Sequence, residues 1–181
     1  MTSTRDALLA AAAELLDTDG PEAVTMRAVG AGAGVSHNTP YKHFADKQVM
    51  LAEIAACELR ETARILRAHR DDPAAALRAA IERSIDRPHR FRLVYGRWTV
   101  ESSALAAAAA DALAALVDLV DAAVAAGRIA TTHPALTADL IRSTVHGAIE
   151  LHLGGHLGKG QAPVTVEQIV DELLARLSPR R

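Results

Sequence analysis

The chain has 181 residues, a formal net charge of −2 and an apolar fraction of 50%, and 39 of its residues are alanine. The length predicts one compact domain, or one domain with a small attached module, and the apolar fraction is too high for a disordered chain. The single cysteine, Cys57, excludes a disulfide framework and a four-cysteine zinc site, and the near-neutral charge gives no overall sign of a nucleic-acid partner.

Helical periodicity runs through the chain, and we find no alternating pattern of a strand. Alanine and leucine are strong helix formers, and glycine and proline divide the sequence into helix-sized segments, so we expect an all-α fold. In the first segment, Leu8, Ala12 and Leu15 share one helical face before Gly20 and Pro21 end the helix. The predicted helices cover residues 4–19, 25–34, 36–44, 46–69, 71–86, 89–95, 101–126, 134–153 and 165–177.

The sequence shows no targeting or membrane segment. The N-terminus lacks the basic and then apolar order of a signal peptide. The longest stretch of low charge runs from Ser102 to Val117, is interrupted by Asp111, and is too short and too weakly apolar to cross a bilayer. We therefore expect a soluble protein of the cytoplasm with no membrane partner.

The segment between Thr25 and Lys47 carries the strongest functional signal. Two short predicted helices are joined by Ala33-Gly34-Val35-Ser36, in which the glycine suits a turn with positive φ and the serine can cap the next helix. This arrangement is typical of the helix-turn-helix, whose second helix enters the DNA major groove.

Polar residues share one face of the second of these helices. His37 and Tyr41 lie four positions apart, as do Asn38 and Lys42, so the four side chains form one polar face. A core helix would not keep so polar a face, and an ordinary solvated helix would not need a tyrosine there.

Pro40 and Phe44 are also four positions apart and point the other way as apolar anchors. Residues 1–50 carry four basic and six acidic residues, so this region is not basic overall, and we expect a shallow salt dependence of DNA binding. Periodicity alone leaves a helical hairpin without a DNA role as an alternative.

The same segment resembles a known family. Thr25-Met26-Arg27-Ala28-Val29, then Gly34-Val35-Ser36, and then Tyr41-Lys42-His43-Phe44 and Lys47 are similar to the DNA-binding segment of tetracycline-repressor (TetR) family regulators. The resemblance covers about residues 4–56. It extends more weakly to 87–95 and to Val145-His146-Gly147, which is similar to the Trp-His-Gly motif of one TetR subgroup with valine in place of tryptophan.

The resemblance implies an all-α, nine-helix architecture, with a helix-turn-helix DNA-binding domain in residues 1–46 and an effector-binding and dimerisation domain in residues 47–181. It also implies a homodimer that binds double-stranded operator DNA, usually represses transcription, and leaves its operator on binding a small-molecule effector. It implies no cofactor.

The family's DNA contacts transfer to ten positions. Thr25 and Arg27 would lie beside the DNA backbone at the start of the second helix. His37, Asn38 and Lys42 would face bases, because asparagine can read adenine and lysine can read guanine. The remaining contacts, mostly to the backbone, would come from Ser36, Thr39, Tyr41, His43 and Lys47.

One position departs from the family pattern. Gly30 stands where the family usually has alanine, and Gly32 follows two residues later. Each glycine costs a helix about 0.5–1 kcal/mol relative to alanine. We therefore expect the second helix to be soft until it docks on DNA.

The resemblance also assigns the last two helices to a dimer interface, where two helices from each subunit would form a four-helix bundle. The alternative is that their apolar stripes pack inside one subunit. The candidate interface residues are Val145, Ile149, His152, Ile169, Leu173 and Leu177.

The effector would bind between residues 57 and 156. Tyr95 and Trp98 are candidate pocket-wall residues because each has an apolar body and a polar tip, and His146 is a third candidate. Ordinary core packing is the alternative for the two aromatic residues, and a buried hydrogen bond beside Gly147 is the alternative for His146.

The sequence gives little support to a metal sensor or an enzyme. His152 and His156 lie four positions apart and could share a metal ion, but His146 lies about 120° round the helix from His152 at 100° per residue, so we predict no metal site. No nucleophile elbow, phosphate-binding loop or paired-carboxylate motif is present, so we predict no catalytic residue and no enzyme. A protein-binding adaptor that has lost DNA binding remains an alternative.

Overall fold

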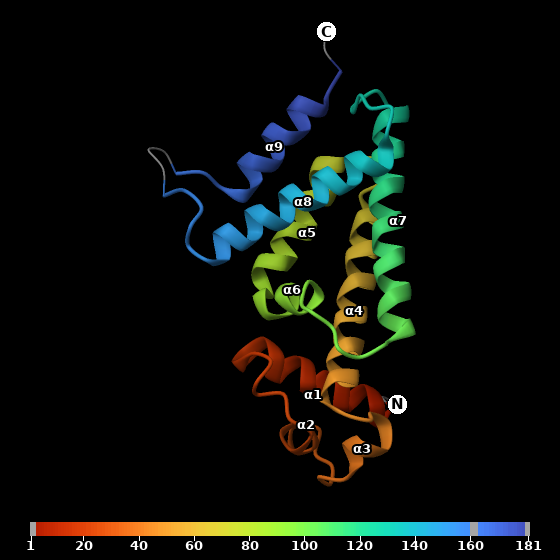
Figure 1. Ribbon diagram of the computed structural model, residues 1–181, viewed down its shortest axis with the longest axis vertical. Coiled ribbons are helices and arrows are strands. Elements are labelled where there is room, and N and C mark those ends of the chain that lie inside the picture. Colours follow the sequence, from red (N-terminus) through yellow and green to blue (C-terminus); the bar gives the residue numbers. More distant parts are fainter. Residues whose placement is uncertain (1–2, 160–162, 180–181) are drawn as a thin grey trace. The chain divides into compact units, whose positions relative to one another are not determined.

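The computed structural model describes residues 3–159 and 163–179, and these residues form an all-helical fold (Figure 1). The predicted all-α class is confirmed, and the described residues contain nine helices. Their bounds are α1 Thr4–Asp19, α2 Met26–Gly32, α3 Thr39–His43, α4 Lys47–Ala68, α5 Pro73–Asp86, α6 Pro88–Val94, α7 Ser103–Ala125, α8 Pro134–Leu153 and α9 Val166–Leu177.

The chain divides into two compact units. Unit 1 consists of residues 3–60 together with 87–109, and unit 2 consists of residues 61–86 together with 110–179. Unit 1 therefore holds α1, α2, α3 and α6, and unit 2 holds α5, α8 and α9. Each unit is described by itself below.

The core of unit 1 forms where α1, α2, α3 and the first part of α4 meet. Ser3 and Asp6 form a capping box that begins α1, and Gly20, with φ of 82°, ends it. The predicted face of α1 is buried, since Leu8 and Leu16 have no exposed surface. The other fully or nearly fully buried side chains of this core are Ala12, Val24, Val29, Phe44, Met50, Leu51 and Ile54.

Unit 2 is built from helices that pack through aliphatic side chains. α8 contacts α9, and α5 contacts both of them. Thr165 caps α9 in a second capping box with Gln168, which fixes where this helix begins. Two ion pairs tie helices of the unit at its surface: Arg67 with Asp111 at 2.5 Å and Arg78 with Asp171 at 2.6 Å.

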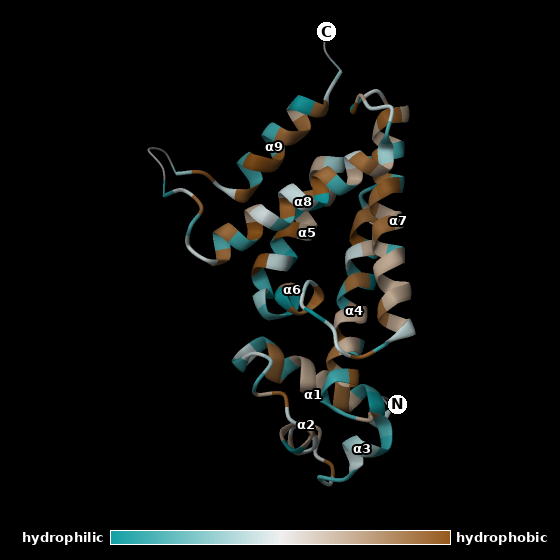
Figure 2. Cartoon of the chain, viewed as in Figure 1, coloured by the Kyte–Doolittle hydropathy of each residue, from teal (hydrophilic) through white to brown (hydrophobic). Residues whose placement is uncertain are grey.

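The structure corrects the sequence-based expectation for the alanine-rich helix. Residues 103–125 form one uninterrupted helix that is long and apolar enough to cross a membrane by length and composition, whereas we expected the apolar stretch to end at Val117. Figure 2 shows apolar residues along most of α7. Core helices of soluble proteins meet the same criterion. Asp111 on this helix forms the ion pair with Arg67.

Candidate DNA-binding surface

The turn between α2 and α3 adopts the geometry that a helix-turn-helix requires. The Thr25 side chain caps α2 by accepting a hydrogen bond from the Ala28 N–H at 3.1 Å. Gly34 has φ of 68°, a conformation that favours glycine. The Ser36 carbonyl then accepts from the Thr39 N–H at 2.9 Å, so the chain enters α3 through a second turn.

The predicted start of the third helix at Ser36 is wrong. α3 begins at Thr39 and has five residues, because residues 37 and 38 form a turn and Asn38 occupies the N-cap position without a side-chain cap bond. The Ser36 and Thr39 hydroxyls lie 2.8 Å apart and share a hydrogen bond instead. His37 and Asn38 therefore precede the helix rather than forming its first turn.

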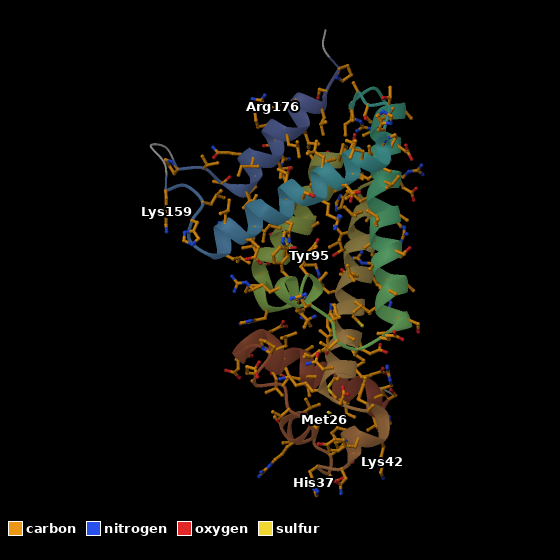
Figure 3. All side chains as sticks on the ribbon, viewed as in Figure 1. Met26, His37, Lys42, Tyr95, Lys159 and Arg176 are labelled. Carbon is orange, nitrogen blue, oxygen red and sulfur yellow. The ribbon has the colours of Figure 1, made fainter. Side chains whose placement is uncertain are left out.

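The predicted DNA contacts are mostly exposed to solvent. Figure 3 shows the side chains of His37 and Lys42 extending from the end of unit 1 that α3 forms, away from α1. Tyr41 is 59% exposed, which is high for a large aromatic side chain. The exposed residues are Thr25, Arg27, Ser36, His37, Asn38, Tyr41, Lys42 and His43, and the half-buried ones are Thr39 and Lys47.

The two predicted anchors are confirmed. Pro40 is buried and Phe44 is 2% exposed. The guanidinium of Arg5, near the start of α1, lies 4.9 Å from the centroid of the Phe44 ring and also pairs with Glu53 of α4 at 3.0 Å. Packing against α1 and α4 therefore holds α3 in place while its polar side chains stay free of the core.

Lys47 lies at the start of α4 and pairs with a carboxylate at the surface. Its ammonium group is 3.7 Å from Glu22, whose side chain is 97% exposed. An ion pair this exposed contributes little to stability, so it can be exchanged for a phosphate at little cost. Asp46 caps the same helix by accepting from the Val49 N–H at 2.9 Å.

Gly30 has a packing role that the sequence did not reveal. A Cβ atom at this position would lie 3.3 Å from the Pro40 ring and 3.3 Å from the Ser36 carbonyl oxygen, and one at Gly32 would lie 3.3 Å from Ala11. The two glycines thus let α2 approach α3 and α1 closely. This close approach explains why glycine suits both positions, and the expected softness of α2 before it docks on DNA stays a prediction.

We expect Gly30→Ala to lower the free energy of unfolding by about 1 kcal/mol, because overpacking against the Pro40 ring and a backbone oxygen outweighs the gain in helix propensity. Urea denaturation of the full chain, followed by circular dichroism, measures the change. A variant more stable than the parent would show that α2 and α3 can move apart freely.

The sequence did not reveal that an arginine of α6 pairs with carboxylates of α1 and α4. Arg90 donates two hydrogen bonds to the Asp17 carboxylate of α1, at 2.8 and 2.6 Å, and its guanidinium lies 3.6 Å from Glu58 of α4. Burial lowers the pKa of Arg90, but the hydrogen bond and charge of Asp17, with Glu58, raise it above its ordinary value. The signal was present in the sequence as four arginines between residues 87 and 97.

The structure distributes the candidate pocket residues between the two units. Tyr95 is 46% exposed and its ring lies 5.2 Å from that of Phe91 in unit 1. Trp98 packs against the core of unit 1, and its indole N–H is buried without a hydrogen-bond partner. His146 is half-buried in unit 2. The assignment of these residues to effector binding stays a prediction.

The candidate dimer residues differ in exposure. Ile149 is 1% exposed, because packing within unit 2 already covers it, whereas His152 is exposed. The other four, Val145, Ile169, Leu173 and Leu177, are half-buried. Among the residues that the structure describes, no group of three histidine, cysteine or acidic side chains could hold a metal ion, and His156 Nδ1 lies 3.0 Å from Lys159 Nζ.

Comparison with known proteins bears on both parts of the chain. Residues 8–54 match the model of bacterial regulatory proteins of the tetR family, and residues 73–177 match the model of a tetracyclin repressor-like C-terminal domain. The second match alone covers more than half of the chain. No curated protein shows significant similarity to the chain.

Solved structures share the fold over nearly the whole chain. A protein of unknown function from Rhodococcus sp. RHA1 is 28% identical, with 99% of this chain and 97% of that chain covered and a TM-score of 0.82. A TetR family transcription regulator from Marinobacter aquaeolei VT8 is 17% identical, with 98% and 96% covered and a TM-score of 0.67. SmeT from Stenotrophomonas maltophilia, the repressor of a multidrug efflux pump, is 23% identical, with 96% and 90% covered and a TM-score of 0.62.

The likeness to the second and third of these structures shows the fold, and the two family matches show the class of protein. TetR-family proteins regulate transcription and are not enzymes, and their N-terminal helix-turn-helix binds DNA. The predicted architecture, an N-terminal helix-turn-helix followed by a helical C-terminal domain, is confirmed. The chain belongs to the TetR family of DNA-binding transcription regulators.

Proposed function

We propose that the chain is a homodimeric repressor that reads operator DNA through α3 and the turn before it. The observation that carries this proposal is the exposed polar surface of His37, Asn38, Tyr41 and Lys42, presented next to buried anchors. Residues in a stable core or on an inert surface would not combine an exposed tyrosine with this polar set.

The proposed DNA-binding domain covers residues 1–46, and the proposed effector-binding and dimerisation domain covers residues 47–181. A cytoplasmic location suits a protein that acts on DNA.

Within this surface, His37, Asn38 and Lys42 read base edges in the major groove. Arg27, Tyr41 and the remaining contacts hold the DNA backbone and fix the register of the protein on the duplex. Thr25 and Ser36 contact DNA in this proposal and also have a structural role, because their hydrogen bonds to Ala28 and Thr39 form the turns that begin α2 and α3.

An exposed apolar stripe on α8 supports the homodimer. Leu136, Leu140 and Leu151 are 67%, 48% and 48% exposed, and they lie within about 60° of one another round the helix at 100° per residue. Gly147 lies on the same stripe, where a Cβ atom would meet nothing within 4 Å, so a second helix could approach closely. A symmetric pairing of α8 and α9 with a second copy would cover this stripe, which lies 100° or more round α8 from Val145, Ile149 and His152, the interface residues expected from the sequence.

The regulation by a small molecule rests on a relative. SmeT has been solved in complex with triclosan, and that structure is 22% identical to this chain with a TM-score of 0.63. We propose that a small-molecule effector binds this chain, with Tyr95, Trp98 and His146 as the candidate residues expected from the sequence, and that its binding releases the operator. Heating the protein with candidate compounds and following the midpoint of unfolding tests this proposal.

Binding of the wild-type protein to a duplex that it selects from a random-sequence pool tests the proposed function directly. We expect sequence-specific binding by the dimer that weakens as salt concentration rises. Binding that ignores sequence, or no binding at all, would favour the protein-binding adaptor over the repressor.

We expect Tyr41→Ala and Asn38→Ala to change DNA binding in different ways. The loss of a phosphate contact at Tyr41 should weaken binding to all sequences, by about 1.5–3 kcal/mol. The loss of a base contact at Asn38 should relax the preference at particular base pairs, each worth about 1–3 kcal/mol. A repeated selection from the random pool, with affinities measured on the selected duplexes, separates the two effects.

Thr99→Ala is the control, because Thr99 is an exposed polar residue of unit 1 outside the helix-turn-helix. Its affinity for DNA should equal that of the parent protein. If Tyr41→Ala and Asn38→Ala also leave affinity and preference unchanged, the contact assignment is wrong.

A further inference from the structure

α6 packs against the DNA-binding unit, although it follows α5 in sequence and lies inside the segment that matches the C-terminal family model. α6 contacts α1 directly. The ring of His89 lies so close to Gly20 that a Cβ atom there would be 3.1 Å from His89 Cε1. Leu93 and Trp98, at the end of α6 and after it, pack against the buried core of unit 1.

The contact between Arg90 and Asp17 supplies a positive charge that the end of α1 lacks. A helix C-terminus carries a partial negative charge that favours basic residues, but the last turn of α1 has none and contains Asp17 and Asp19. Arg90 of α6 supplies the missing cation by forming the bidentate pair with Asp17. Its side chain is 17% exposed, so solvent screens this pair less than it screens the pairs Arg5–Glu53 and Lys47–Glu22 of the same unit.

α6 and the residues after it also change the net charge of unit 1. Residues 1–60 contain five basic and eight acidic residues, a net charge of −3, which opposes binding to DNA. Residues 87–109 contain four arginines and one glutamate, a net charge of +3. With α6 in place, unit 1 is therefore neutral.

The position of α1 matters for the DNA-reading surface because α2 and α3 pack on it. α2 approaches α1 closely at Gly32 and Ala11, and Arg5 of α1 covers the Phe44 ring that anchors α3. A shift of α1 would therefore move the side chains that face DNA.

We propose that Arg90 is a positioning residue for DNA binding, which clamps α6 to Asp17 of α1 and to Glu58 of α4. This inference rests on the proposed DNA-reading role of α3 and adds a residue far from it in sequence. The clamp has two effects: it fixes the platform on which α3 lies, and it offsets the acidic charge of that platform. Both effects are lost when the hydrogen bonds between Arg90 and Asp17 are broken and α6 leaves α1.

The test compares Arg90→Gln and Asp17→Asn with Arg97→Gln in the full-length protein. Arg97 is an exposed arginine of the same unit, so its variant removes the same charge without removing the clamp. The DNA is the duplex that the wild-type protein selects from a random-sequence pool. Trp98 is the only tryptophan of the chain, so its fluorescence reports the packing of the segment after α6 without DNA.

We expect Arg90→Gln to weaken DNA binding about tenfold and Arg97→Gln to weaken it less than about twofold. Asp17→Asn is the sharper variant, because removing an acidic charge alone should strengthen DNA binding, whereas breaking the clamp should weaken it. The double variant should bind no more weakly than the weaker single variant, because both changes break one interaction. Trp98 emission should shift in Arg90→Gln and Asp17→Asn and stay unchanged in Arg97→Gln.

Several outcomes would overturn the proposal. Equal losses for Arg90→Gln and Arg97→Gln, or stronger binding by Asp17→Asn, would show that only net charge matters. Unchanged Trp98 emission in both clamp variants would show that α6 stays docked without Arg90. If Arg90→Gln fails to fold by circular dichroism, the nearly isosteric Asp17→Asn decides alone. If the wild-type protein binds no DNA, the proposed function fails together with this inference, whereas normal binding by wild-type and both clamp variants refutes the clamp only.

Discussion

Replacing Phe44 with alanine is expected to lower the free energy of unfolding by about 3–5 kcal/mol and to abolish operator binding at ordinary temperature. Phe44 is 2% exposed and is one of the largest side chains in the core of unit 1. Its removal leaves a cavity and also takes away the ring beneath Arg5. Because α3 has only five residues, it has little stability of its own and depends on this anchor.

Urea denaturation followed by circular dichroism measures the loss for Phe44→Ala, and titration of the selected duplex measures binding. Phe44→Leu is the matched control, since it keeps an apolar side chain and should lose less stability and retain sequence preference. Tyr41→Ala, in contrast, should lose affinity without losing stability, because Tyr41 is 59% exposed. A Phe44→Ala protein with full affinity would show that α3 is positioned by other contacts.

Leu140→Asp is expected to convert the proposed dimer into monomers, raising the dimer dissociation constant by at least about a hundredfold. In a symmetric dimer each interface holds two copies of residue 140, so the substitution buries two unpaired charges. The fold of one subunit should be unaffected, because Leu140 is 48% exposed. Operator affinity should fall with it, because a monomer can occupy only one half-site.

Sedimentation equilibrium, or light scattering over a range of concentrations, measures the dimer. Ala135→Asp is the charge-matched control: Ala135 is exposed on α8 about 140° round the helix from Leu140 at 100° per residue. It should remain dimeric. A dimeric Leu140→Asp with normal operator affinity would place the interface elsewhere than on the stripe of Leu136, Leu140 and Leu151.

The helix pattern was predictable because it depends on local signals. Capping residues such as Thr25, Asp46 and Thr165 and helix-ending glycines such as Gly20 act within a few positions of the chain, and the structure uses each of them. The family motif is also a local signal, and it identified the DNA-binding segment. These features need no knowledge of which helices pack together.

The errors arose where distant contacts decide the local structure. Ser36 is a good capping residue, yet its hydroxyl shares a hydrogen bond with the Thr39 hydroxyl, and residues 37 and 38 form a turn. The helix therefore begins only at Thr39, and its Pro40 packs closely against Gly30. α6 follows α5 in sequence, yet Arg90 finds its partner 73 positions earlier, at Asp17. Such pairings are set by tertiary packing, which a single sequence does not display.

In α3 and the residues next to it, different side chains pack against the core and face solvent, and this separation has a consequence for changing the specificity of the protein. Pro40 and Phe44 bear the packing, whereas His37, Asn38 and Lys42 are exposed and contribute little to it. Substitutions at exposed positions usually change stability by less than about 0.5 kcal/mol. The three exposed residues can therefore be randomised together and screened against new operator sequences, with most members of such a library still folding.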